Sequence, residues 1–137
     1  MLMSEQQIRL NEVRLKIKET LDFIRFLQEN HPDRPLAHAL DEHIPFFREQ
    51  LTALKEEVRQ LGALPREPDP EHELVEQMLA ELKSLFGEDK DLVLLQEFNK
   101  HRNDIVDTIQ YALEVDYPGN IRHTLQRVSR YSRSIRA

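Results

Sequence analysis

Apolar residues recur every three or four positions along most of this chain, a spacing that predicts amphipathic helices. Four long segments show it: 6–30, 36–61, 90–115 and 120–136. A shorter segment, 70–86, shows it after a stretch rich in proline. No segment alternates apolar and polar residues as a half-buried strand does, and no Asn-Gly or Asp-Gly pair indicates a hairpin. The pattern therefore predicts an all-α protein of five helices.

Segment 36–61 has the most regular apolar spacing, yet it contains Pro45. Proline has no backbone N–H to bond the carbonyl of Asp41, and its ring crowds the preceding turn. We therefore expect a kink or bulge beside Glu42 and His43. Such a turn is either a site built on these polar side chains or a bend that leaves them in water, and we favour the bend.

Segment 6–30 carries apolar residues on two sides. The main stripe consists of Leu10, Val13, Ile17, Leu21, Ile24 and Leu27. A second line, on roughly the opposite side, consists of Ile8, Leu15, Phe23 and Phe26. A surface helix needs only one apolar stripe, so this helix is expected to pack on both sides. The second side would meet a crossover segment of the same chain or a partner subunit, and the latter predicts a homodimer.

Segment 90–115 places Arg102 near the centre of its apolar face. A guanidinium at core depth keeps its charge, so it needs acceptors that offset its desolvation. We expect a buried ion pair or hydrogen-bond cluster, with Asp22, Glu19 or Tyr131 as the partner. Alternatively, Arg102 extends along the edge of the helix to water.

The length and composition place the chain in a broad class. With 137 residues it can form one domain, 1–137, whose core needs no disulfide or metal. It has no cysteine, which excludes disulfides, thiolate metal sites and a cysteine nucleophile. No apolar run approaches the roughly 18 residues that span a bilayer, and the first residues lack the apolar core of a signal peptide. We therefore expect a cytoplasmic protein that does not contact membranes.

The charge of the chain is unevenly distributed. The net charge is −6, but residues 118–137 contain five arginines and no acid, so this segment is +5 and the remainder is −11. The basic patch consists of Arg122, Arg127, Arg130, Arg133 and Arg136. Such a helix either binds phosphates or an acidic partner, or lies against acidic neighbours in its own bundle, which we favour. The acidic remainder would repel nucleic acid.

The order of the segments, and the sequences EEVRQLG, FGEDKD, LLQEFNKHRNDIVDTIQYAL and RYSRSIR within it, resembles small bacterial ferritin-like domains of unknown function. The resemblance covers nearly the whole chain and implies a ferritin-like four-helix bundle. A long crossover would join its second and third helices and would contain segment 70–86 as an additional short helix. That helix would be ~25 Å long, enough to cross the bundle, so the third bundle helix would run parallel to the second.

The resemblance also implies a metal site, since ferritin-like proteins bind two iron or manganese ions between four helices. Their ligands include two Glu-x-x-His pairs, and this chain contains none. The remaining candidate ligands are Glu97, His101 and Asp104 on one predicted helix, and Glu42 and His43 on another. Because hard metals need several oxygens that converge, two helices in place of four indicate a degraded site, and we expect no cofactor.

Little in the sequence indicates catalysis. The serines of segment 120–136 have no neighbouring histidine base, and three isolated glycines cannot form a phosphate-binding loop. Three functions remain, which we rank in this order. The first is a non-catalytic bundle that acts through protein interaction. The second is an iron or manganese protein with an irregular ligand set. The third is an adaptor that binds nucleic acid or an acidic partner through the basic patch.

Overall fold

The computed structural model describes residues 4–65 and 90–136. Over these residues the chain forms five helices and no strand: α1 (Glu5–Asn30), α2 (Pro35–Asp41), α3 (Ile44–Gln60), α5 (Lys90–Ala112) and α6 (Gly119–Ser134). The all-α class is confirmed for this part of the chain. The predicted helix 70–86 lies outside the described residues. No helix among those described is long and apolar enough to cross a membrane.

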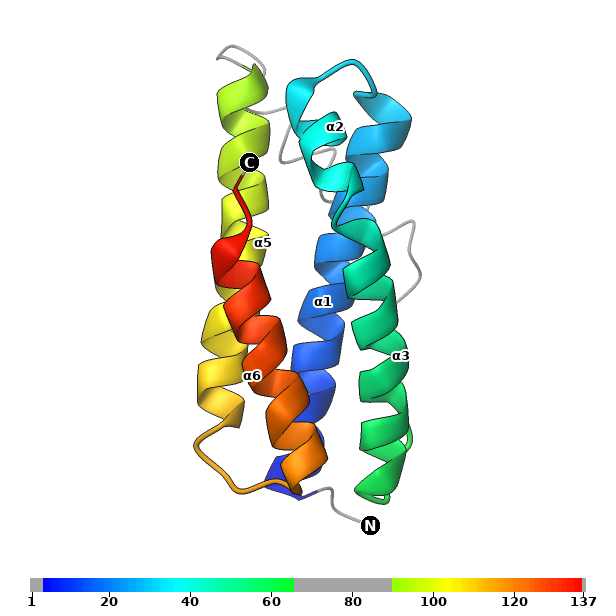
Figure 1. Ribbon diagram of the computed structural model, residues 1–137, viewed down its shortest axis with the longest axis vertical. Coiled ribbons are helices and arrows are strands. Elements are labelled where there is room, and N and C mark those ends of the chain that lie inside the picture. Colours follow the sequence, from blue (N-terminus) through cyan, green and yellow to red (C-terminus); the bar gives the residue numbers. More distant parts are fainter. Residues whose placement is uncertain (1–3, 66–89, 137) are drawn as a thin grey trace.

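The four long helices lie side by side, with α2 at one end of the bundle (Figure 1). Helix α1 runs toward α2, and α3 and α5 both return in the opposite direction, before α6 turns back along α1's direction. Helices α1 and α6 each pack on both α3 and α5. Each long helix therefore has two antiparallel neighbours, and the two helices that follow the same direction lie diagonally opposite.

Helix α1 is buried on two sides, as its sequence predicts. Its main stripe is at most 1% exposed, from Leu10 to Leu27. On the second side Phe23 and Phe26 are also buried, and the ring of Phe23 lies 5.1 Å from that of His101 in α5. Of the second line, only Ile8 is exposed, at 40%. The second side of α1 therefore exposes little apolar surface to a partner subunit. The homodimer stays a prediction.

The segment predicted as one helix, 36–61, is two helices in the structure. Helix α2 ends at Asp41, Glu42 and His43 form a turn, and α3 begins at Ile44. Pro45 stands in the first turn of α3, where its missing N–H costs nothing because first-turn amides have no partner within the helix. The proline therefore breaks the helix where we expected a kink, and the break turns His43 toward α6.

The far end of the bundle is fixed by contacts between α1 and the end of α3. The side-chain amide of Gln7 donates a hydrogen bond of 2.7 Å to the carbonyl of Leu61. Gly62 follows with a φ of 84°, a left-handed conformation that glycine adopts without strain and that commonly ends helices. This end therefore holds α1 and α3 in register, which in turn sets the positions of α3 side chains beside α6.

Candidate interaction surface on helix α6

The five predicted metal ligands are divided between two places. On α5, Nε2 of His101 lies 3.4 Å from Oε1 of Glu97, in poor alignment for a hydrogen bond, and Asp104 follows one turn later. His101 is only 8% exposed. Burial lowers the pKa of His101 to about 4, although the charge of Asp104 acts to raise it. The imidazole is therefore neutral at pH 7.

The other two predicted ligands lie at the turn before α3. Nε2 of His43 is 3.5 Å from Oε1 of Glu42, and Nδ1 is 2.6 Å from the hydroxyl of Tyr131 in α6. His43 thus faces α6, whereas His101 faces α1. Among residues 4–65 and 90–136, no three His, Asp or Glu side chains gather in a group that could hold a metal ion. Iron or manganese binding stays a prediction that this part of the structure does not support.

Arg102 has a partner that the sequence did not indicate. Its Nη1 donates a hydrogen bond of 2.7 Å to the carbonyl of Ile135, the residue that ends α6. The three side chains that we expected as partners are engaged elsewhere: Asp22 with Lys18, Glu19 with Lys16, and Tyr131 with His43. The half-buried guanidinium therefore satisfies a helix C-terminus, where the backbone carries partial negative charge.

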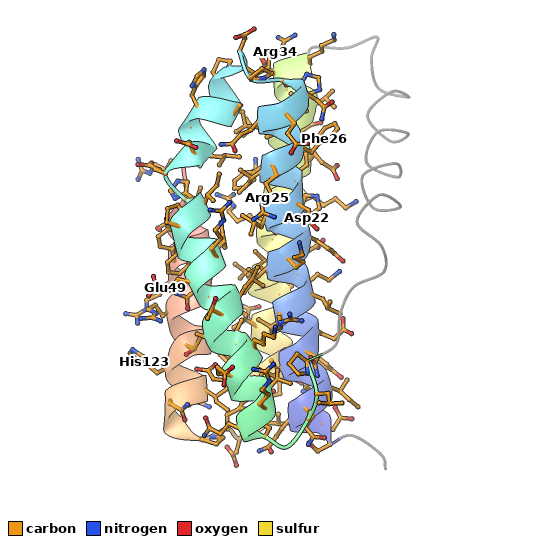
Figure 2. All side chains as sticks on the ribbon, turned by 90° about the vertical axis from the view of Figure 1, so that its right-hand side faces the viewer. Asp22, Arg25, Phe26, Arg34, Glu49 and His123 are labelled. Atoms are coloured by element: carbon orange, nitrogen blue, oxygen red, sulfur yellow. The ribbon has the colours of Figure 1, made fainter. Side chains whose placement is uncertain are left out.

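The five arginines of the basic patch are all exposed, four on α6 and Arg136 just after it, and we call them the arginine face: Arg122, Arg127, Arg130, Arg133 and Arg136. The opposite face of α6 is buried through Ile121, Leu125 and Val128. His123 also projects outward from α6, on the side of the bundle where Glu49 projects from α3 (Figure 2). These arginines and His123 are therefore all open to solvent.

The arginine face makes no ion pair with the acidic neighbours that we had favoured, although the charge of Arg127 acts on the Glu57 carboxyl. Within the described part of the chain, none of its five members forms an ion pair with a carboxylate. The physical reason is the geometry of the bundle: the buried side of α6 consists of apolar and hydroxyl residues, so the exposed arginines extend into solvent, and only Arg127 also reaches a side chain of α3. A surface of +5 therefore remains available to an external anion.

Behind the arginine face, α6 is joined to α3 by three polar pairs, which we call the polar seam. The side-chain amides of Gln60 and Asn120 exchange hydrogen bonds of 2.8 and 3.3 Å. The Thr124 hydroxyl donates to Oε1 of Glu57 at 2.6 Å, and Nη2 of Arg127 donates to Oε1 of Gln50 at 3.2 Å. The polar seam therefore consists of side chains from both helices: Gln50, Glu57, Gln60, Asn120, Thr124 and Arg127.

Glu57 is the buried carboxyl of the polar seam. It is 8% exposed, and its Oε2 has no hydrogen-bond partner in the described structure. Burial raises the pKa of Glu57, while the Thr124 hydrogen bond and the charge of Arg127 act to lower it. Sequence reasoning missed this residue, although a signal was present: Glu57 lies three residues after Leu54 and one before Val58, within the apolar stripe of its segment.

The chain matches no protein-family model, no curated protein and no solved structure. The features of the molecule itself must therefore indicate its function. Chief among them is an exposed set of five guanidinium groups on and just after α6, none of which is paired with a carboxylate in the described structure, on a helix that is attached to α3 through polar side chains.

Proposed function

We propose that this protein is a non-catalytic helical bundle of ferritin-like arrangement that acts through protein interaction. The contact surface in this proposal is the arginine face. The shared direction of α3 and α5 supports the ferritin-like arrangement, because a long connection between the second and third bundle helices produces that topology. A non-catalytic role is supported by the dispersal of the titratable side chains, which lie in separate pairs on different sides of the bundle.

The observation that carries the proposal is the unpaired state of the arginine face. Residues three apart are neighbours on the surface of a helix, so the like charges of Arg127, Arg130 and Arg133 repel one another. Partner carboxylates would remove that repulsion. Guanidinium groups also bind carboxylates through two parallel N–H···O bonds, which gives such a contact direction as well as charge.

An acidic protein segment fits this surface better than nucleic acid does. Helix α6 has 16 residues and is therefore ~24 Å long, so a short acidic segment can pair with it alone. A longer polyanion would extend over the rest of a chain whose remainder carries −11. Tyr131 of α6 is half-buried against Phe46 at 3.6 Å, which leaves the imidazole of His123 as the one exposed ring of α6 on which a base could stack.

The proposal is tested by titrating the full chain with a fluorescent polyglutamate peptide at low and physiological salt. We expect binding that weakens with salt and falls about tenfold or more when Arg122, Arg130 and Arg133 are changed to Gln, because exposed ion pairs contribute roughly 0.2–1 kcal/mol each. The matched control removes three charges from the other long helices, with Arg25, Lys55 and Lys100 changed to Gln. It should bind almost as the unmodified chain does.

Two outcomes would contradict the proposal. Failure of the unmodified chain to bind, or equal weakening by both triple variants, would show that the arginine face has no special role. Duplex DNA of similar length, run as a competitor, tests the nucleic-acid alternative: tighter binding to DNA through the same arginines would assign the face to nucleic acid. The mass of each sample in solution tests the homodimer, and a dimer that persists in both variants would use another surface.

A further inference from the structure

We infer that Arg127 is the anchor of the arginine face and that Gln50 positions it. This inference rests on the proposed function and concerns how the face recognises a carboxylate. Arg127 is the one member of the face whose guanidinium is held by another side chain in the described structure. The other four arginines make no side-chain hydrogen bond in that part of the molecule.

The residue that holds Arg127 is itself fixed. Gln50 is 1% exposed within α3, and its Oε1 accepts the hydrogen bond from Nη2 of Arg127 at 3.2 Å. Because the side-chain amide of Gln50 is buried and fixed, it holds one end of the Arg127 guanidinium in one position. The rest of the guanidinium therefore extends from the polar seam toward solvent. A guanidinium has five N–H donors, and Gln50 occupies one. The remaining donors include a pair that can bind a carboxylate through both oxygens.

Glu57 does not compete for this guanidinium. Its Oε1 accepts from the Thr124 hydroxyl at 2.6 Å, and the structure contains no ion pair between Glu57 and Arg127. The charge of Arg127 nevertheless acts on the Glu57 carboxyl, so the two groups are near one another. Gln50 therefore holds Arg127 from behind, and Glu57 occupies none of the donors that face the ligand.

A fixed arginine loses less freedom on binding than a mobile one. Long side chains lose rotamer entropy when a partner immobilises them, and this cost reduces their contribution to affinity. Arg127 has lost most of that freedom already on folding, whereas Arg122, Arg130, Arg133 and Arg136 have not. We expect an arginine whose guanidinium is already held by Gln50 to contribute most of the binding energy, as single arginines in interfaces often do.

Charge-matched single variants test the anchor. Each of the five arginines is changed to Gln, and polyglutamate binding is measured at one salt concentration. We expect Arg127→Gln to weaken binding about tenfold and each of the others about twofold, since only the first removes a positioned group. Equal weakening by all five variants would overturn the inference, because it would show that the face acts only through its total charge.

The role of Gln50 is tested by Gln50→Met, which keeps the length of the side chain and removes the acceptor. We expect polyglutamate binding to weaken about threefold or more, while its salt dependence stays unchanged because no charge is lost. The same substitution made in Arg127→Gln should then weaken binding no further, since coupled residues are not additive. Additive weakening would show that Gln50 acts elsewhere in the fold and would overturn its positioning role.

A second variant keeps the inference testable if Gln50→Met unfolds, which circular dichroism would reveal. Arg127→Lys keeps the charge but has no planar fork, so it should weaken binding several-fold, whereas Arg122→Lys should not. Equal binding by Arg127→Lys and Arg122→Lys would contradict the role of Arg127 as the anchor. Failure of the unmodified chain to bind polyglutamate would overturn the proposed function together with this inference, whereas uniform binding by all variants would overturn the inference alone.

Discussion

The hydroxyl of Tyr131 lies 2.6 Å from Nδ1 of His43, and this contact joins α6 to the turn between α2 and α3. The ring of Tyr131 also stacks on Phe46, with 3.6 Å between ring centroids, and meets Phe47 edge-on at 6.1 Å. Burial and the charge of Glu42 raise the pKa of Tyr131, so its phenol stays protonated at neutral pH. The helix break at Pro45 thus provides the histidine that holds one end of α6.

Removing the Tyr131 hydroxyl should therefore destabilise the fold. We expect Tyr131→Phe to lower the free energy of unfolding by about 1 kcal/mol, because the hydrogen bond to His43 is lost while the stack on Phe46 remains. Urea denaturation followed by circular dichroism measures the change. Tyr111→Phe is the control, since Tyr111 is exposed and contacts Arg9 through its ring face and its backbone carbonyl, both of which phenylalanine keeps. An equal loss in both variants would argue against the Tyr131–His43 bond.

Arg102 should stabilise the end of α6. We expect Arg102→Met to lower the free energy of unfolding by about 1–2 kcal/mol, because the carbonyl of Ile135 loses a charged donor at a helix C-terminus. The packing of the aliphatic stem on α5 is retained in methionine. Arg102→Lys keeps a cation there and should recover part of the loss. Unchanged or raised stability in Arg102→Met, measured by urea denaturation, would show that this contact contributes nothing.

Much of the fold could be predicted because helix formation and burial follow local patterns. The stripe from Leu10 to Leu27 is buried throughout, since residues three and four apart share one face of a helix whatever lies against it. Pro45 marked the break because its effect on the preceding turn is also local. Whether the proline would bend the helix or divide it was not decided by the local sequence.

The candidate site was only partly predictable, for a related reason. The exposure of the arginines followed from the apolar residues on the opposite face of α6. Their pairing did not, because it depends on the register of α3 against α6, and Gln50 and Arg127 are 77 residues apart. The partner of Arg102 is a backbone carbonyl, which has no signature in the sequence. A search for acidic side chains could not have found it.

The buried carboxyl of Glu57 should make the fold less stable at high pH than at low pH. Its pKa is raised in the folded state, so the folded chain binds the proton more tightly than the unfolded chain does. This contribution is fully present below the ordinary pKa of a glutamate and is lost as the pH rises through the raised value. Glu57→Gln should therefore increase the unfolding free energy at pH 8 more than at pH 4, and the opposite order would contradict this reading.

The metal prediction can be tested directly. Among the described residues no three candidate ligands converge, so we expect protein purified without chelator to contain no stoichiometric iron or manganese in elemental analysis. A chelator should leave its thermal unfolding temperature unchanged. Stoichiometric metal that is lost in Glu97→Gln or His101→Gln, but kept in His123→Gln, would overturn this expectation and identify a metalloprotein.

His101 should make the fold less stable as the pH falls, whereas Glu57 should make it less stable as the pH rises. The pKa of His101 is about 4 in the folded chain because burial disfavours the charged imidazole, while the ordinary value is 6.5. Between these values the unfolded chain binds more protons, so its contribution to stability is complete above pH 6.5 and is lost as the pH falls toward 4. His31, whose pKa is also lowered chiefly by burial, adds a loss of the same sign.

The difference between these two pKa values corresponds to a loss of about 3 kcal/mol from His101 over this range, as an upper estimate. We expect urea denaturation at successive pH values to show stability falling from pH 6.5 to pH 4, and His101→Phe to remove most of that fall. Phenylalanine keeps a ring against Phe23 but cannot be protonated. His123→Phe is the matched control, because His123 is exposed and its loss should leave the pH dependence unchanged. A pH dependence that survives in His101→Phe would assign acid sensitivity to another group.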